Sequence, residues 1–269
     1  MPKNKKKKIY IVTDLEGISG VLTFTDTGRD TNRSGPRYEA ARLLLTEDVN
    51  AAVQGALDGG AGEIIVNDGH GGGSNFVMAN LHPGARYFSG SGRIKALDGL
   101  DESTDAVMLV GFHAMSGTRG AVMDHTQSSA VWHRYFLNGI EMGEIGQMSV
   151  IAGHFNAPVI CVTGDLAATL EAKALLGDIE TAAVKEGRSR TSAICLAPKK
   201  ARELIRAAAK CSLGKIGKIK PYKIKTPVEI KLECATTDAA DSREKGGAER
   251  LDGFTVRRVV SSALDIMKI

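Results

Sequence analysis

The sequence is short of cysteine, aromatic residues and long apolar segments. It has four cysteines, which are widely spaced and form no CxxC pair of the kind that holds structural zinc or exchanges disulfides. We therefore expect reduced, buried thiols in a cytoplasmic protein. No segment reaches the roughly 18 consecutive apolar residues of a membrane-spanning helix. Neither GxGxxG nor GxxxxGK(S/T) occurs in the Gly-rich stretch at 69–73, so the sequence does not predict a nucleotide-binding loop.

The formal net charge of +4 comes from one end of the chain. Five of the first eight residues are lysines: Lys3, Lys5, Lys6, Lys7 and Lys8. Without them the remaining 30 basic residues face 31 acidic ones, so the rest of the chain is nearly neutral. It carries no basic stripe interleaved with aromatic residues, and no nucleic-acid partner is expected. We interpret residues 1–8 as a solvated Lys-rich tail; contact with phosphate or a membrane surface is the alternative.

Three short apolar runs in the first half end abruptly in acidic residues or histidine beside glycine. They cover residues 9–13, 63–66 and 106–110, and lead into Asp14-Leu15-Glu16-Gly17, Asn67-Asp68-Gly69-His70 and Gly111-Phe112-His113. Near-continuous apolar runs of this length are typical of strands covered on both faces, as in a parallel sheet. A helix is predicted between the first two runs, at about residues 37–57, because its apolar residues recur at helical spacing. Together these segments predict a βαβ unit.

The second half of the chain continues with mixed elements. A β-hairpin is expected at 129–142 with its turn at Asn138-Gly139, helices at 143–152, 166–176 and 201–211, and strands at 158–162, 228–234 and 254–260. The predicted fold is α/β, with a mostly parallel sheet flanked by helices and a second, smaller α/β or α+β lobe. We place the boundary near residue 155, which gives a first lobe of residues 9–155 and a second of residues 156–269.

The polar residues that follow the three strands predict a shared site. Ligands in open parallel sheets bind beyond the C-terminal ends of the strands. That edge receives Asp14 and Glu16 from the first strand, Asp68 and His70 from the second, and His113 from the third. Carboxylates and histidines gathered there need a cation to organise them, and mixed His/carboxylate ligation suits zinc. Each residue alone has a simpler explanation, such as a turn, a helix cap or a packed histidine; the repeated pattern favours a metal site.

These segments resemble the zinc-dependent D-aminopeptidases of the DppA type. The resemblance begins with the DxEGxxG element that starts at Asp14 and continues through Asn67-Asp68-Gly69-His70, Leu81-His82-Pro83 and Gly111-Phe112-His113. It includes Met123-Asp124-His125 and Gly143-Glu144-Ile145-Gly146. The motifs follow the family's order over about residues 9–155, and a weaker match extends into the second half.

The resemblance implies a function and a set of site residues. Asp14 would bridge two zinc ions, and Glu16, His70, His113 and Glu144 would complete the ligands. His125 would be the catalytic histidine. Which ligand serves which ion stays open, and manganese or cobalt are possible substitutes. The implied substrates are short peptides with an N-terminal D-amino acid such as D-Ala. The implied assembly is a ring-shaped homo-oligomer, such as a decamer, with the second lobe shaping the substrate site and the assembly.

Two other functions remain open from the residues. One is a different two-metal reaction, by another amidase or a phosphoesterase; a phosphoesterase would need a basic residue at the site, and Arg119 is the nearest candidate. The other is a non-catalytic peptide-binding or scaffold protein. Asp124, which precedes His125, is a departure from the small polar residue expected there, and it adds a carboxylate next to the proposed catalytic histidine.

Overall fold

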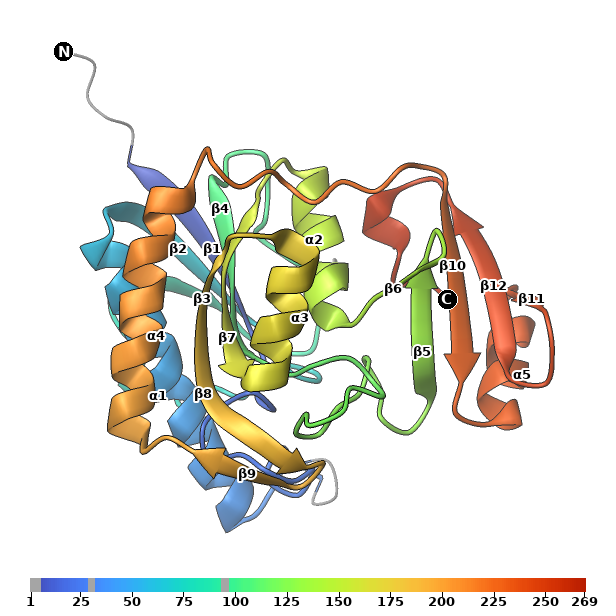
Figure 1. The fold of residues 1–269 in the computed structure, drawn as a ribbon, viewed down its shortest axis with the longest axis horizontal. Helices are drawn as coiled ribbons and strands as arrows, with labels where there is room; N and C mark the ends of the chain where they lie inside the picture. Colours follow the sequence, from blue (N-terminus) through green and yellow to red (C-terminus); the bar gives the residue numbers. More distant parts are fainter. Residues whose placement is uncertain (1–5, 29–31, 93–96) are drawn as a thin grey trace.

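The computed structural model describes residues 6–28, 32–92 and 97–269, and its elements form two sheets (Figure 1). The larger sheet has the strand order β3-β2-β1-β4-β7-β8-β9. All neighbours in it are parallel except β9, which is antiparallel to β8. Its strands are β1 (Lys7–Thr13), β2 (Ala61–Asp68), β3 (Arg86–Phe88), β4 (Ala106–Phe112), β7 (Val159–Asp165), β8 (Glu180–Ser189) and β9 (Ser192–Cys195).

The second sheet is antiparallel, with the order β11-β12-β10-β5-β6. It consists of β5 (Trp132–Leu137), β6 (Ile140–Glu141), β10 (Val228–Cys234), β11 (Glu249–Arg250) and β12 (Thr255–Val260), and α5 (Thr237–Lys245) packs against it. Three short 3-10 helices lie at Met78–Asn80, Leu213–Lys215 and Ala263–Asp265. The predicted fold class, α/β with a mostly parallel sheet flanked by helices and a second, smaller α/β or α+β lobe, is confirmed, and the smaller part is built on the antiparallel sheet.

Helices cover both faces of the large sheet. Figure 1 shows α1 (Pro36–Asp58) and α4 (Pro198–Ser212) on one side, and α2 (Glu144–His154) and α3 (Leu166–Leu176) on the other. Successive residues of a strand point to opposite faces, so Ile9 and Ile11 join the core under α1 and α4, while Tyr10 and Val12 join the core under α2 and α3. The second core continues through α2 into the antiparallel sheet, which ties the two sheets together.

The division of the chain differs from the two lobes expected at residue 155. Strands β7, β8 and β9 lie beyond that residue but belong to the large sheet, and β5 and β6 lie before it but belong to the second sheet. The reason is that the chain leaves the large sheet for the β5–β6 hairpin and returns through α2, a helical crossover that brings β7 parallel to β4. Strands β8 and β9 and helix α5 are further elements that the sequence patterns did not predict.

The N-terminal lysines also differ from the expected tail. Residues 1–5 lie outside the described part of the chain. Lys7 and Lys8, however, are the first residues of β1 and pair with Asp105 and Asp101 at 3.2 and 2.9 Å. Backbone pairing with β2 and these ion pairs hold both lysines in the sheet. No helix within the described ranges is both long and apolar enough to cross a membrane.

Candidate metal centre

The C-terminal ends of β1 and β4 are held together by their backbones. The amide of Asp14 donates to the carbonyl of Val110 at 2.8 Å, and the amide of Gly17 donates to the carbonyl of Gly111 at 2.7 Å. Gly17 packs so closely that a Cβ atom there would lie 2.0 Å from the carbonyl oxygen of Phe112, so only glycine fits this position. This contact brings the segment that carries Asp14 and Glu16 directly beside His113.

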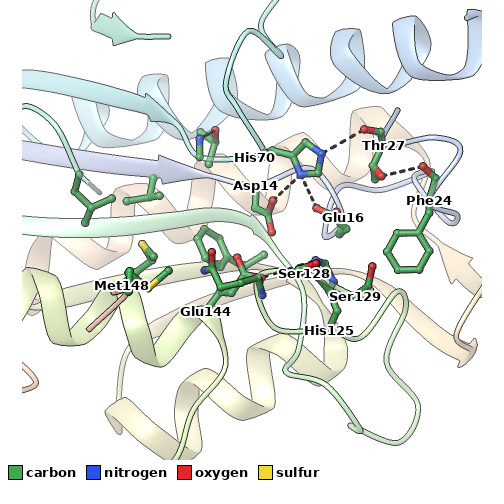
Figure 2. A pocket seen from close by; sticks show the side chains of 18 of the residues that line it. Asp14, Glu16, Phe24, Thr27, His70, His125, Ser128, Ser129, Glu144 and Met148 are labelled. Atoms are coloured by element: carbon green, nitrogen blue, oxygen red, sulfur yellow. Dashed lines mark hydrogen bonds and ion pairs between the residues drawn. The ribbon is translucent and has the colours of Figure 1, made fainter. Parts of the chain in front are cut away.

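The structure brings together four of the five residues expected at this sheet edge, namely Asp14, Glu16, His70 and His113. Asp14 lies between two histidines: its Oδ1 is 3.1 Å from Nδ1 of His70, and its Oδ2 is 3.3 Å from Nε2 of His113. Oε2 of Glu16 is 2.9 Å from Nδ1 of His70. Oε1 of Glu144, at the start of α2, is 3.3 Å from Nε2 of His113. Figure 2 shows Asp14 and Glu16 pointing toward the ring of His70.

Asp68 does not join this cluster, although it ends β2 in the same pattern. Its carboxylate accepts hydrogen bonds from the amide and the side chain of Asn75, at 2.6 and 2.7 Å, and from the hydroxyl of Ser89. It therefore holds the Gly-rich loop that carries His70. The expectation that Asp68 reaches the shared edge together with His70 is wrong, because the loop turns back over the carboxylate.

Each of the three site histidines is oriented by a contact with a backbone carbonyl. Each has one ring nitrogen on a backbone carbonyl: His70 on Thr27, His113 on Ala114 and His125 on Met123, at 3.3, 2.9 and 2.8 Å. A carbonyl only accepts, so that nitrogen carries a hydrogen, and the other nitrogen, which faces the carboxylates, is the one that can bind a metal ion when it has no proton. Metal-ligating histidines are oriented in this way.

Burying these carboxylate and imidazole groups would cost free energy if no cation were bound to them. Asp14, Glu16 and His113 are at most 5% exposed, and Oδ2, Oε2 and Nε2 of these residues have no hydrogen-bond partner in the described part of the chain. Two groups of donor atoms each lie within 4.8 Å of one another, namely His113 with His125 and Glu144, and Asp14 with Glu16 and His113. Unsatisfied buried carboxylate and imidazole atoms that converge in this way fit a bound metal ion.

The close packing of charged groups in the cluster also shifts their pKa values. Burial and the neighbouring carboxylate of Glu16 raise the pKa of Asp14 to about 7. Burial opposes protonation of His70 and His113, but the surrounding carboxylates outweigh it and raise the pKa of both rings well above the usual value. The cluster thus attracts positive charge, and a metal ion would displace these protons.

His125 forms one wall of the site. Its ring stacks on that of His113 with centroids 4.0 Å apart and an angle of 11°, and it meets the Phe24 ring in a T-shaped arrangement with centroids 5.8 Å apart. Its Nε2 is 3.8 Å from Oε1 of Glu144. Burial and then the neighbouring His113 lower the pKa of His125, so its imidazole is neutral near pH 7.

Residue types alone did not identify Glu144 as a site residue, because a carboxylate at a helix N-terminus is common. The structure gives it a specific role. Its Oε1 accepts a hydrogen bond from the amide of Gln127 at 2.7 Å, so it connects the loop that follows His125 to α2. The only sequence signal for it was the family motif around Gly143.

Two basic residues at the site were missed. Lys185 on β8 is 3% exposed, and its ammonium donates to the carbonyls of Glu16, Ile18 and Val21, the last two at 2.9 and 2.5 Å. Arg33 lines the cavity that opens onto the cluster. Arg119, the basic residue favoured from the sequence, lines a different pocket beside α3, so it does not supply the charge that a phosphoesterase needs.

The cavity has a volume of about 710 Å³, which is sufficient for a short peptide. Its lining includes the polar side chains of Asp14, Glu16, His70, His125 and Glu144 and the apolar side chains of Phe24, Leu97, Met148 and Met267 (Figure 2 labels Phe24 and Met148). Met267 comes from the C-terminal end of the chain. The cavity is thus built from segments far apart in the sequence.

Comparison with known proteins agrees with this arrangement. The profile of a family described as D-aminopeptidase matches residues 7–269. The chain belongs to the D-aminopeptidase family. Members of this family are peptidases, and the chain is accordingly a hydrolase. It is 36% identical over 237 residues to the D-aminopeptidase of Bacillus subtilis strain 168, which covers 87% of this chain and 84% of that protein.

A solved structure of the D-aminopeptidase family also matches. It is described as the Zn-dependent D-aminopeptidase DppA from Bacillus subtilis, a self-compartmentalizing protease. The match has a TM-score of 0.90 and 31% sequence identity, and it covers 97% of this chain and 94% of that one. The two sheets and their connections are therefore those of a known D-aminopeptidase fold.

Proposed function

We propose that this chain is a zinc-dependent aminopeptidase that removes an N-terminal D-amino acid from short peptides. Two zinc ions would be held by Asp14, Glu16, His70, His113 and Glu144. The observation that carries the proposal is the position of Asp14, whose two carboxylate oxygens face different histidines, as a bridging ligand requires. Manganese or cobalt would suit the same ligands.

The metal ions and the protein side chains would contribute different steps of the proposed reaction. A bound zinc pair lowers the pKa of a coordinated water toward ~7 and polarises a carbonyl group. The protein supplies His125, a neutral imidazole whose Nδ1 is committed to the carbonyl of Met123. Its Nε2 therefore carries the lone pair, so it is the atom that would accept a proton as a general base and, once protonated, donate that proton to the substrate.

The substrate class follows from the cavity and from family membership. A volume of about 710 Å³ with polar side chains in its lining suits a di- or tripeptide. Met267 lines the wall, which supports the expectation that residues 156–269 help to shape the substrate site. Selectivity for a D-residue rests on the family, since no contact within the described residues reports chirality.

We further propose that the chain assembles into a ring-shaped homo-oligomer, such as a decamer, that limits access to small peptides. The support is the self-compartmentalizing description of the similar Bacillus protein. Leu166 and Leu170 of α3, 38% and 59% exposed, are apolar surface that an assembly would cover. Sedimentation velocity at several concentrations tests this assembly.

The four free cysteines are consistent with a reducing, cytoplasmic location.

The deciding experiment is a measurement of metal content alongside cleavage of D-Ala-D-Ala and L-Ala-L-Ala. We expect about two equivalents of zinc, the number that a two-metal site holds, and selective cleavage of the D-peptide. Metal binding with no cleavage of either peptide would keep the metal site and reject the aminopeptidase. Protein that binds no metal after zinc loading would reject both.

A further inference from the structure

We propose that Arg190 is a positioning residue for His125. It lies in the turn between β8 and β9, far from His125 in the sequence, yet it contacts the backbone before His125, the preceding carboxylate and the aromatic ring beside it. The inference rests on the proposed role of His125 in the reaction.

The backbone around His125 has an unusual shape that must be held in place. Met123 and Gln127 both have left-handed conformations, with φ of +50° and +60°. Such conformations are unfavourable for residues with side chains and persist where the surroundings fix them. The amide of Met123 donates to the carbonyl of Arg190 at 2.8 Å. The β8–β9 turn is therefore one of the contacts that fix this backbone.

The side chain of Arg190 binds Asp124, the residue that follows Met123 in the sequence. Its Nε is 3.0 Å from Oδ1 of Asp124, and its Nη2 donates to the main-chain carbonyl of Asp124, also at 3.0 Å. The other carboxylate oxygen of Asp124 accepts from the amide of Gly117 at 2.8 Å. The charge of Asp124 is thus paired with Arg190. Asp124 does not act as a second carboxylate in the substrate site, and its carboxylate links the segment before His125 to two other parts of the chain.

Arg190 also supports the ring on the outer side of His125. Its guanidinium carbon lies 5.2 Å from the centroid of the Phe24 ring. The edge of Phe24 meets the His125 ring with centroids 5.8 Å apart at an angle of 76°. His113 stacks on His125 at 4.0 Å. Arg190 therefore restrains His125 twice, through its backbone and through Phe24.

The exposure of Arg190 separates this role from a general contribution to stability. Its side chain is 52% exposed, and an ion pair at such a site contributes little to folding. A displacement of His125 by about 1 Å, in contrast, is enough to lower turnover by about two orders of magnitude. Removing the guanidinium should therefore reduce catalysis and leave the fold and the metal ligands intact.

The test compares Arg190→Gln with Arg188→Gln. Arg188 is near the end of β8, two residues before Arg190; it is 59% exposed and pairs with Glu186, so it is a matched exposed arginine with a different partner. We expect Arg190→Gln to lower kcat roughly 10- to 100-fold with little change in KM or zinc content. Arg190→Lys should recover part of the loss. Asp124→Asn should lower kcat in the same direction, and the double variant should lose less than the product of the two single effects because the two side chains share the Arg190–Asp124 ion pair.

A second measurement follows the position of His125 without using activity. Diethyl pyrocarbonate modifies accessible imidazoles, and peptide mapping gives the rate for each histidine. His133 and His154 are exposed and serve as internal standards, while His113 reports general loosening. We expect faster modification of His125 in Arg190→Gln, with His113 unchanged.

The two measurements separate this inference from the proposed function. Cleavage of no peptide by the wild type would reject the aminopeptidase, and the modification rates would still test Arg190. Equal modification of His125 in wild type and Arg190→Gln would overturn the inference, whether or not kcat fell. So would a parallel rise at His113 and His125, or a more accessible His125 with undiminished kcat in an active enzyme.

Discussion

Lys185 places its ammonium group against the main-chain carbonyl of Glu16, one of the five proposed metal ligands. The same ammonium donates to the carbonyls of Ile18 and Val21, and the whole side chain is buried. One residue of β8 thus holds the turn that follows β1 in the conformation that presents the carboxylate of Glu16. Burial lowers the pKa of Lys185 to about 8, as expected for a charge taken out of water.

Replacing Lys185 by Met should weaken both the fold and the site. The change leaves three carbonyls without this donor, and each buried unsatisfied group costs about 1–3 kcal/mol. We expect a loss of several kcal/mol in the free energy of unfolding, measured by urea titration, and weaker zinc binding in competition with a chelator. Lys200→Met is the control, because Lys200 is 60% exposed and pairs with Glu203 on the same helix. Unchanged zinc affinity in a folded Lys185→Met protein would contradict the role assigned to this lysine.

Glu144→Gln tests the ligand that only the family motif indicated. The amide oxygen of glutamine still accepts from the amide of Gln127, so the local backbone contact is kept while the charge is removed. We expect the zinc content to fall from about two equivalents toward one, because one of the two metal ions would lose a carboxylate. Glu141→Gln, on the nearby hairpin, should keep the full content. Two tightly held zinc ions in Glu144→Gln would exclude Glu144 as a necessary ligand.

His125→Ala separates catalysis from metal binding. The neutral imidazole is placed to act on the substrate, and removal of a general acid or base typically costs about 10²- to 10⁴-fold in rate. We expect kcat to fall within that range at unchanged zinc stoichiometry, measured by D-Ala-D-Ala cleavage and elemental analysis of the same samples. His125 is also close enough to Glu144 to share a cation. Loss of zinc from the variant would therefore reassign His125 as a ligand.

Asp48 on α1 predicts a pH-dependent change in stability away from the site. It is 2% exposed, faces Arg202 of α4 at 3.5 Å, and burial raises its pKa to about 7. A carboxyl whose pKa is raised on folding binds more protons in the folded state than in the unfolded state. Its ionisation therefore lowers stability as the pH rises from about 4 to about 7. Asp48→Asn removes this cost.

The Asp48→Asn variant should be more stable than the wild type at pH 8, by up to about 4 kcal/mol for a shift of about three pKa units. The gain should shrink steadily as the pH approaches 4. Urea unfolding of both proteins at several pH values, with the metal content held constant, measures it. A loss at pH 8 would show that the pair with Arg202 outweighs the burial of the charge, and a gain that is the same at all pH values would show that it does not come from the ionisation of Asp48.

Sequence patterns predicted the features of this protein that depend on residues close together in the chain. The apolar runs that end at Asp14, His70 and His113 predicted three parallel strands and the edge where their polar residues meet, because strand direction and side-chain alternation are local properties. The exact bounds of α3 and β10 followed for the same reason. Glu144 and His125 were indicated by family motifs and not by their own surroundings.

Only the tertiary structure decided which distant groups support the site. Asp68 ends β2 and His70 follows it by two residues, yet the carboxylate of Asp68 binds Asn75 and lies outside the cluster that His70 joins. Lys185 and Arg190 occupy an edge hairpin that no pattern predicted, and their roles depend on contacts with residues more than 60 positions away. A buried ammonium and a paired guanidinium look like ordinary surface charges in the sequence, because desolvation and hydrogen bonding arise only when the chain packs.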